Sequence, residues 1–245
     1  MSKVKATMPR EASSTSEVQN EKTKPKSAFG GFRKRTMTAR QFVGGMMSLA
    51  PKAATLYQVW LKHEIDPGFR EELMVAVSRL NDCRYCSWGH HEWAHMIGVP
   101  DDELAHIEQM DPSGFDRRKW VAISYVRALV SVDFGTVEKE LMNEMKLNYS
   151  PREIREIELI AKVMDIANRG SNTWDAMLSR LRGAPANDSH VLDEVVLSGA
   201  FLATAPVVFF FLARASKRGF FEMARSLIDY TKHYEQRPSP SRKVK

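Results

Sequence analysis

Cysteine is scarce in this chain: two of its 245 residues are cysteines, and they stand together as Cys83-x-x-Cys86. Two cysteines cannot supply the several bridges of a secreted disulfide framework, so the spacing favours an intracellular, redox-active pair. Haem attachment requires histidine directly after the second cysteine, but Ser87 stands there. No second C-x-x-C follows, which argues against a structural zinc site, because such sites usually draw on two ligand pairs.

Two further absences bear on the fold and the location. Nowhere does the sequence sustain the period-two alternation of half-buried strands, so we predict an all-α protein. Residues 1–38 contain no apolar run of the signal-peptide type and are rich in polar residues and proline, so we expect a disordered tail. Residues 39–235 form the predicted helical domain and residues 236–245 a polar C-terminal tail. The expected location is the cytoplasm.

The positive charge of the chain is concentrated in its N-terminal tail. The formal net charge is +6, and residues 1–35 contain nine lysines and arginines but only three glutamates. The tail therefore accounts for the whole imbalance, and the remainder is neutral. A neutral body argues against a broad nucleic-acid surface.

The two thiols and an imidazole are predicted to lie on one helix. Asn81 and Asp82 are good N-cap residues, so we expect this helix to begin there and to end near Ile97. Thiols in its first turns would lie at the positive end of the helix dipole, which lowers a thiol pKa. His90 follows Cys86 by one turn on the same face, where it can accept or relay a proton.

The residue pattern alone leaves other interpretations open. With His90, His91 and His95 nearby, the cysteine pair could be half of a zinc site, or two inert, buried thiols. If the pair is redox-active, we expect Cys83 to be the more exposed thiol because it is nearer the helix end. That position suits a thiol that meets a reductant.

The stretch 70–98 resembles a known family. The run Glu71-x11-Cys83-x2-Cys86-x3-His90 is similar to the signature of alkylhydroperoxidase D-like proteins, within the carboxymuconolactone decarboxylase superfamily. The resemblance implies a multi-helix bundle without bound cofactor or metal, assembled as a dimer, trimer or hexamer. It also implies that Cys86 attacks a peroxide, that Cys83 resolves the product, and that Glu71 and His90 relay protons.

Two residues fit the family pattern less simply. Some members carry histidine between the cysteines as a further relay residue, whereas this chain has Tyr85. On a helical wheel Glu71 lies nearly opposite the stripe of Leu73 and Val77, which predicts a solvated glutamate. Only its spacing to the first cysteine indicates a site residue, and the neighbouring Glu72 is a possible substitute.

Hydrophobic periodicity and capping signals predict the remaining helices. They cover Leu49–Leu61, Phe69–Asn81, Pro100–Met110, residues 120–130, a stretch from Thr136 to about Leu147, a long helix from the Ser150-Pro151-Arg152-Glu153 capping box to Leu181, and Phe220–Tyr234. Residues 195–213 carry no charge and are long enough for a membrane span. Because Pro206 interrupts them, we expect two buried helices that meet at residues 204–206. Such apolar helices predict an oligomer core, and a membrane partner is not expected.

The predicted function is that of a thiol-dependent peroxidase or disulfide reductase. Its partners would be a peroxide substrate and an external dithiol or protein thiol that resets the cysteine pair. One alternative is a cofactor-free decarboxylase or lyase of the same fold, which would not depend on the cysteines. Another is a helical redox-sensing assembly protein whose thiols signal without turnover.

Overall fold

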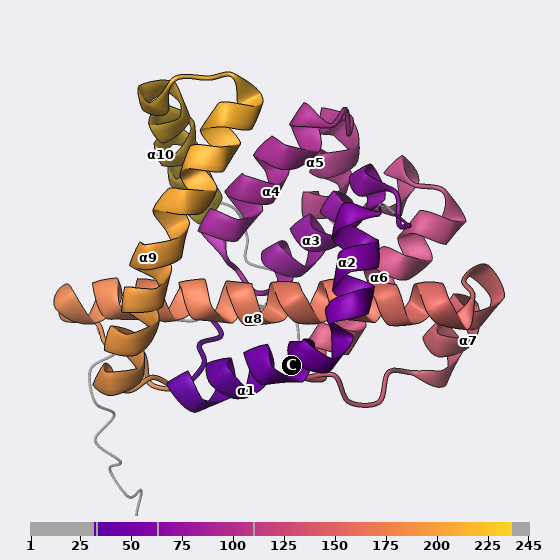
Figure 1. Ribbon diagram of the computed structural model, residues 1–245, viewed down its shortest axis with the longest axis horizontal. Coiled ribbons are helices and arrows are strands. Elements are labelled where there is room, and N and C mark those ends of the chain that lie inside the picture. The colour runs from indigo at the N-terminus through magenta and orange to yellow at the C-terminus, as the bar shows by residue number, and fades with distance from the viewer. Residues whose placement is uncertain (1–31, 33, 63, 110, 237–245) are drawn as a thin grey trace, which may run out of the picture. The chain divides into compact units, whose positions relative to one another are not determined.

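The structure is a computed structural model that describes residues 32, 34–62, 64–109 and 111–236 (Figure 1). Within these residues the chain forms helices and no strand, which confirms the predicted all-α class. Most of the polar tail expected over residues 1–38, and residues 237–245 of the C-terminal tail, lie outside the described residues.

The helices of the described chain follow one another with short connections. They are α1 (Ala39–Leu49), α2 (Ala53–Leu61), α3 (Pro67–Leu80), α4 (Arg84–Met96), α5 (Asp101–Gln109), α6 (Arg117–Ser131), α7 (Lys139–Asn148), α8 (Pro151–Leu181), α9 (Val191–Ser216) and α10 (Phe220–Gln236), with 3-10 turns at Ala50–Lys52 and Pro112–Gly114. Helix α1 was not predicted, and most other bounds lie within a few residues of the predicted ones.

Capping residues explain where the core helices α3 and α8 begin. The Asp66 carboxylate accepts the Phe69 N–H at 2.8 Å ahead of Pro67, and so caps α3. At the start of α8 the Ser150 hydroxyl accepts the Glu153 N–H at 3.3 Å, while the Glu153 carboxylate accepts the Ser150 N–H at 2.8 Å. The predicted capping box is therefore confirmed.

Helix α3 is the centre of the domain. It packs against α4, α5, α6 and α8, and every residue from Arg70 to Arg79 is buried. The wheel-based expectation that Glu71 is solvated is therefore wrong, because a helix surrounded by others has no solvent face. Two of these helices, α4 and α6, also pack on α8, which runs as one straight rod through the view of Figure 1.

The apolar segment near the C-terminus differs from its prediction. Helix α9 is continuous over 26 residues with Pro206 inside it, so the expectation of two helices meeting there is wrong. An interior proline removes one backbone hydrogen bond and kinks a helix, yet it need not end it. Much of α9 is also exposed rather than buried, including Val208 and Phe210. By length and composition alone, α9 is the one helix of the described chain that could cross a membrane.

The last residues assigned to the N-terminal tail lie on the domain. Arg35 donates to the Val130 carbonyl at 2.9 Å, and the Thr36 carbonyl accepts from Arg169 at 3.0 Å. Met37 is buried in an apolar cluster with Leu49 and residues of α8 and α9. The last residues of the segment predicted as tail therefore contact the domain, which composition averaged over a segment does not reveal.

We expect the anchor formed by residues 34–37 to stabilise the domain measurably. Deletion of residues 1–37 should lower the free energy of unfolding by about 2–4 kcal/mol, through loss of buried Met37 and the hydrogen bonds of Arg35 and Thr36. Deletion of residues 1–31 should leave it nearly unchanged. Urea denaturation of both truncations compares them, and equal stabilities would show that the anchor contributes nothing.

Candidate active site

The thiol pair begins α4, although not as its capping signals predicted. Asn81 ends α3, and Asp82 turns the chain with a left-handed φ of 57°. Cys83 itself is the N-cap, since its sulfur accepts the N–H of Cys86 at 3.3 Å. The helix therefore starts two residues later than expected, because Asn81 completes the preceding helix.

The two cysteines are joined by a disulfide, with Cα atoms 5.4 Å apart. Cys83 is fully buried, and its N–H donates to the Ser78 carbonyl of α3 at 3.0 Å. Cys86 is half-buried, and its sulfur lies 3.5 Å from the Ser171 hydroxyl of α8. The expectation that Cys83 is the more exposed thiol is wrong, since the N-cap is held against α3 while the next turn faces a cavity.

Glu71 and His90 form the hydrogen-bonded pair that their spacing suggested. A Glu71 carboxylate oxygen lies 2.7 Å from His90 Nδ1, and the other oxygen accepts from Arg70 at 3.0 Å. Burial alone would raise the pKa of Glu71, but His90 and Arg70 together hold it below its usual value. The ionised carboxylate can only accept, so Nδ1 carries the hydrogen and Nε2 is left for a partner in the cavity.

Glu72 does not substitute for Glu71. Its side chain is buried on another side of α3, where Lys119 of α6 donates to it at 2.9 Å. Lys119 also donates to Glu103 at 2.9 Å, so the three side chains tie α3, α5 and α6 together. Glu72 does not line the cavity that contains Glu71; its contacts are the charged hydrogen bonds that join these helices.

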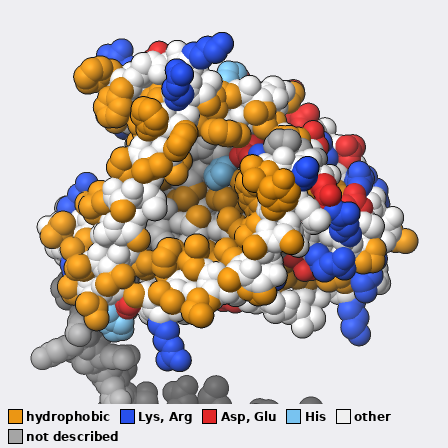
Figure 2. All heavy atoms as spheres, in the orientation of Figure 1, with side chains coloured by type: hydrophobic (Ala, Val, Ile, Leu, Met, Phe, Trp, Pro, Cys, Tyr) orange, Lys and Arg blue, Asp and Glu red, His pale blue; other side chains and the backbone are white. Residues whose placement is uncertain are grey.

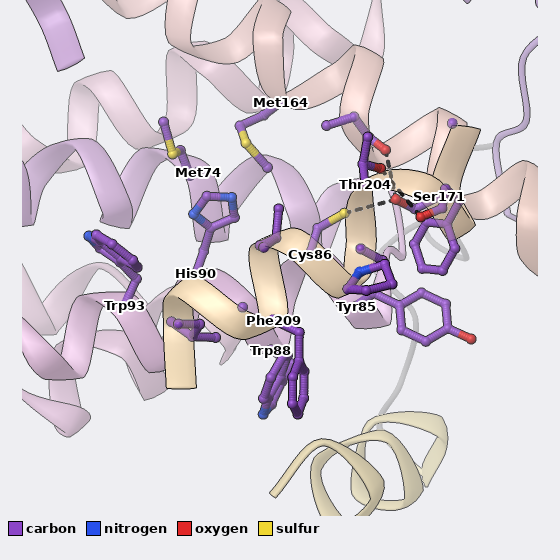
Figure 3. Close-up of a pocket in the computed structure, with 18 of the residues that line it drawn as sticks. Met74, Tyr85, Cys86, Trp88, His90, Trp93, Met164, Ser171, Thr204 and Phe209 are labelled. Atoms are coloured by element: carbon purple, nitrogen blue, oxygen red, sulfur yellow. Dashed lines mark hydrogen bonds between the residues drawn. The ribbon is translucent and has the colours of Figure 1, made fainter. Parts of the chain in front are cut away.

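Cys86, His90 and Glu71 line one apolar cavity of about 1230 Å³. Figure 3 shows Cys86 and His90 on α4 with Met74 and Met164 nearby, and with Trp88, Trp93 and Phe209 around the same space. The cavity also reaches the surface, where Figure 2 shows a hollow bordered by hydrophobic side chains, with a histidine inside. Most of the residues around it come from α3, α4, α8, α9 and α10.

Tyr85, the residue between the cysteines, takes part in a charged network beside the cavity. Its hydroxyl donates to Asp175 at 3.1 Å and accepts from Arg84 at 2.9 Å. Burial, followed by the charge of Asp175, raises the pKa of Tyr85, so the phenol stays protonated. Lys34 and Arg84 both pair with Asp175, at 2.5 and 2.7 Å. Tyr85 therefore has no direct link to His90 in these contacts and instead fixes the start of α4 to α8.

Sequence reasoning missed Ser171 and Asp175 as site residues. Both lie on α8, more than 80 residues after the cysteines along the chain. The long apolar periodicity of α8 predicted its existence but not which turn would face the thiols. Residue spacing along the chain predicts contacts within one helix, but it does not predict which residues of two distant helices meet in the folded protein.

The described residues contain no group of three histidine, cysteine, aspartate or glutamate side chains that could hold a metal ion. Comparison of the chain with protein-family models, curated proteins and solved structures gives no match.

The unequal burial of the two sulfurs predicts the order in which they react after reduction. Cys86 opens on the cavity, whereas Cys83 has no exposed surface. Iodoacetamide should therefore alkylate Cys86 at least about tenfold faster than Cys83, because the reagent reaches only an accessible thiolate. Peptide mass spectrometry over a time course measures both rates. Faster labelling of Cys83 would mean that the sulfur at the N-cap is the accessible nucleophile.

Proposed function

We propose that this protein is a thiol-dependent peroxidase in which Cys86 is the nucleophile and Cys83 the resolving thiol. The observation that carries the proposal is that Cys86 and the Glu71–His90 pair open on the same cavity. A thiol one turn from an imidazole, which is itself oriented by a buried carboxylate, is the arrangement of an activated nucleophile. The resemblance of residues 70–98 to alkylhydroperoxidase D-like proteins adds to this support.

In the first step the reduced Cys86 gives its proton to Nε2 of His90. The thiolate attacks the outer oxygen of the hydroperoxide, so that an S–O bond forms while the O–O bond breaks. The departing alkoxide takes the proton from His90 and leaves as an alcohol. Glu71 stays ionised and stabilises the imidazolium that exists between these two proton transfers.

In the second step the Cys83 sulfur attacks the sulfur of the Cys86 sulfenic acid. The S–S bond forms as the S–O bond breaks, and the hydroxide that leaves takes the Cys83 proton to become water. The hydroperoxide is thereby reduced to alcohol and water at the expense of two thiols. An external dithiol or protein thiol then reduces the disulfide by exchange and is itself oxidised.

The cavity walls favour an organic hydroperoxide over hydrogen peroxide. Almost all of its lining is aliphatic or aromatic, including Leu49, Trp60 and Phe201. Transfer of an apolar substituent from water to such walls contributes about 25 cal/mol per Å² of buried surface. Hydrogen peroxide has no such substituent, so it gains nothing from the cavity.

Substitution of each cysteine separates their roles. Cys86→Ser should abolish peroxide consumption, because the attacking sulfur is gone. Cys83→Ser should consume one equivalent and stop, since no thiol is present to resolve the sulfenic acid, which dimedone would trap on Cys86. Peroxide consumption and mass spectrometry measure both effects. The reverse pattern, with Cys86→Ser reacting once, would exchange the two assignments.

Substitution of the proton relay tests for general acid–base catalysis. His90→Ala and Glu71→Gln should slow the reaction with peroxide by about 10²–10⁴-fold if each serves proton transfer. Glu72→Gln, one position along α3 and outside the cavity, is the matched control and should keep the rate. Stopped-flow kinetics with a dithiol also separates an enzyme from a sensor, because a sensor oxidises once without turnover. Loss of stability with an unchanged rate would leave the pair a purely structural role.

A further inference from the structure

The corner where α9 turns into α10 presents an unusual group of exposed aromatic side chains. Phe210, Phe211, Phe220 and Phe221 are 63%, 60%, 64% and 86% exposed. The rings of Phe220 and Phe221 lie 5.8 Å apart, so they form one apolar patch rather than scattered residues. Patches of large exposed apolar side chains mark interaction surfaces in soluble proteins.

Basic side chains surround this patch. Arg214, Lys217 and Arg225 are exposed, and Figure 2 shows blue and orange side chains next to one another at this corner. Arg218 donates to Glu92 at 2.7 Å and to Glu222 at 2.8 Å, so the nearby carboxylates are already paired. Residues 209–232 contain five lysines and arginines against two acidic residues, which leaves the corner positively charged.

The turn between α9 and α10 contains Lys217, which is exposed. This residue ends α9 in the left-handed conformation, with a φ of 56°. Glycine is the usual residue there, because any side chain is strained in that conformation. Here the residue is lysine, so the turn carries a further positive charge beside the phenylalanines.

We propose that the α9–α10 corner docks on an anionic lipid bilayer, with the phenylalanines in the interface and the basic side chains on the headgroups. Aromatic side chains beside lysine and arginine are the composition of interfacial membrane anchors. A second copy of the chain would complement the apolar patch but would bring the same positive charges toward each other in a two-fold contact. An anionic bilayer complements both features.

Helix α9 lies on the bilayer in this proposal and does not cross it. Although α9 is long enough to span, it packs against α8 and buries Leu197, Ser198 and Leu212 within the domain. A membrane partner was not expected from the sequence, because the apolar residues 195–213 were predicted to be buried. The exposure of α9 in the structure removes this argument against a membrane partner. Phe210 and Phe220 also line the cavity that contains Cys86, so the docking surface is continuous with the cavity mouth.

Vesicle sedimentation of the full chain tests this surface without reference to any activity. The protein should bind mixed phosphatidylcholine–phosphatidylglycerol vesicles, bind phosphatidylcholine alone far more weakly, and dissociate as salt is raised. Phe211→Ser and Phe221→Ser should each weaken binding by about 10-fold, because each loses the burial of one phenylalanine. Neither residue lines the cavity. Lys217→Glu should reduce the preference for the anionic vesicles by about fivefold or more.

Matched controls lie on α7, away from the corner. Leu147 is 80% exposed and Lys146 is its basic neighbour, so Leu147→Ser and Lys146→Glu should bind vesicles like the wild type. Circular dichroism melts establish that each variant is folded. The proposal is overturned if the wild type does not sediment with anionic vesicles, or if the phenylalanine variants bind unchanged. It is equally overturned if light scattering shows an oligomer that Phe211→Ser dissociates, since the patch would then be covered by a second copy.

Discussion

The candidate site depends on the pairing of one buried carboxylate on α3, that of Glu71. An isolated charge inside a protein is strongly destabilising unless it is paired and hydrogen-bonded. Glu71 meets this requirement through Arg70 on its own helix and His90 on α4. Because the Glu71–His90 hydrogen bond joins α3 to α4, it holds the face of α4 that carries His90 toward the cavity. Cys86, one turn before His90, is thereby held on that face.

The cavity changes how strongly these groups act. Apolar walls lower the local dielectric constant, so the hydrogen bond between Glu71 and His90 is stronger than it would be in water. The same walls give an apolar substrate a reason to enter. Helix α8 completes the arrangement by placing Ser171 against the Cys86 sulfur and Asp175 against the first turn of α4. The chemistry would thus come from the Glu71–His90 pair and the substrate preference from the apolar walls, and both act at the Cys86 sulfur.

Local signals in the sequence predicted those features of the fold that depend on residues close together along the chain. The helical class, the capping box at Ser150 and the helix that carries the thiols all follow from spacing and residue type. The hydrogen bond between Glu71 and His90 agrees with the twelve-residue spacing of Glu71 to Cys83, although the helical wheel placed Glu71 in solvent. A wheel assumes one apolar and one solvated face, whereas α3 has no solvated face between Arg70 and Arg79 because other helices surround it.

What depends on distant packing could not be predicted in this way. The burial of Cys83 follows from its contact with α3, and the positions of Ser171 and Asp175 follow from the crossing of α4 and α8. Pro206 was expected to divide α9, but a proline at an exposed position costs a helix only one hydrogen bond and a kink. Nor does composition distinguish a buried apolar helix from one that presents its apolar face outward, as α9 does.

The most direct test of the account is a single-turnover reaction of the fully reduced protein with one equivalent of an organic hydroperoxide. The alcohol formed and the mass of the Cys83–Cys86 peptide should be measured in the same sample. The account predicts one alcohol for each protein molecule that loses two hydrogens as its disulfide forms. Disulfide formation without alcohol, or alcohol formed while both thiols stay reduced, would contradict it.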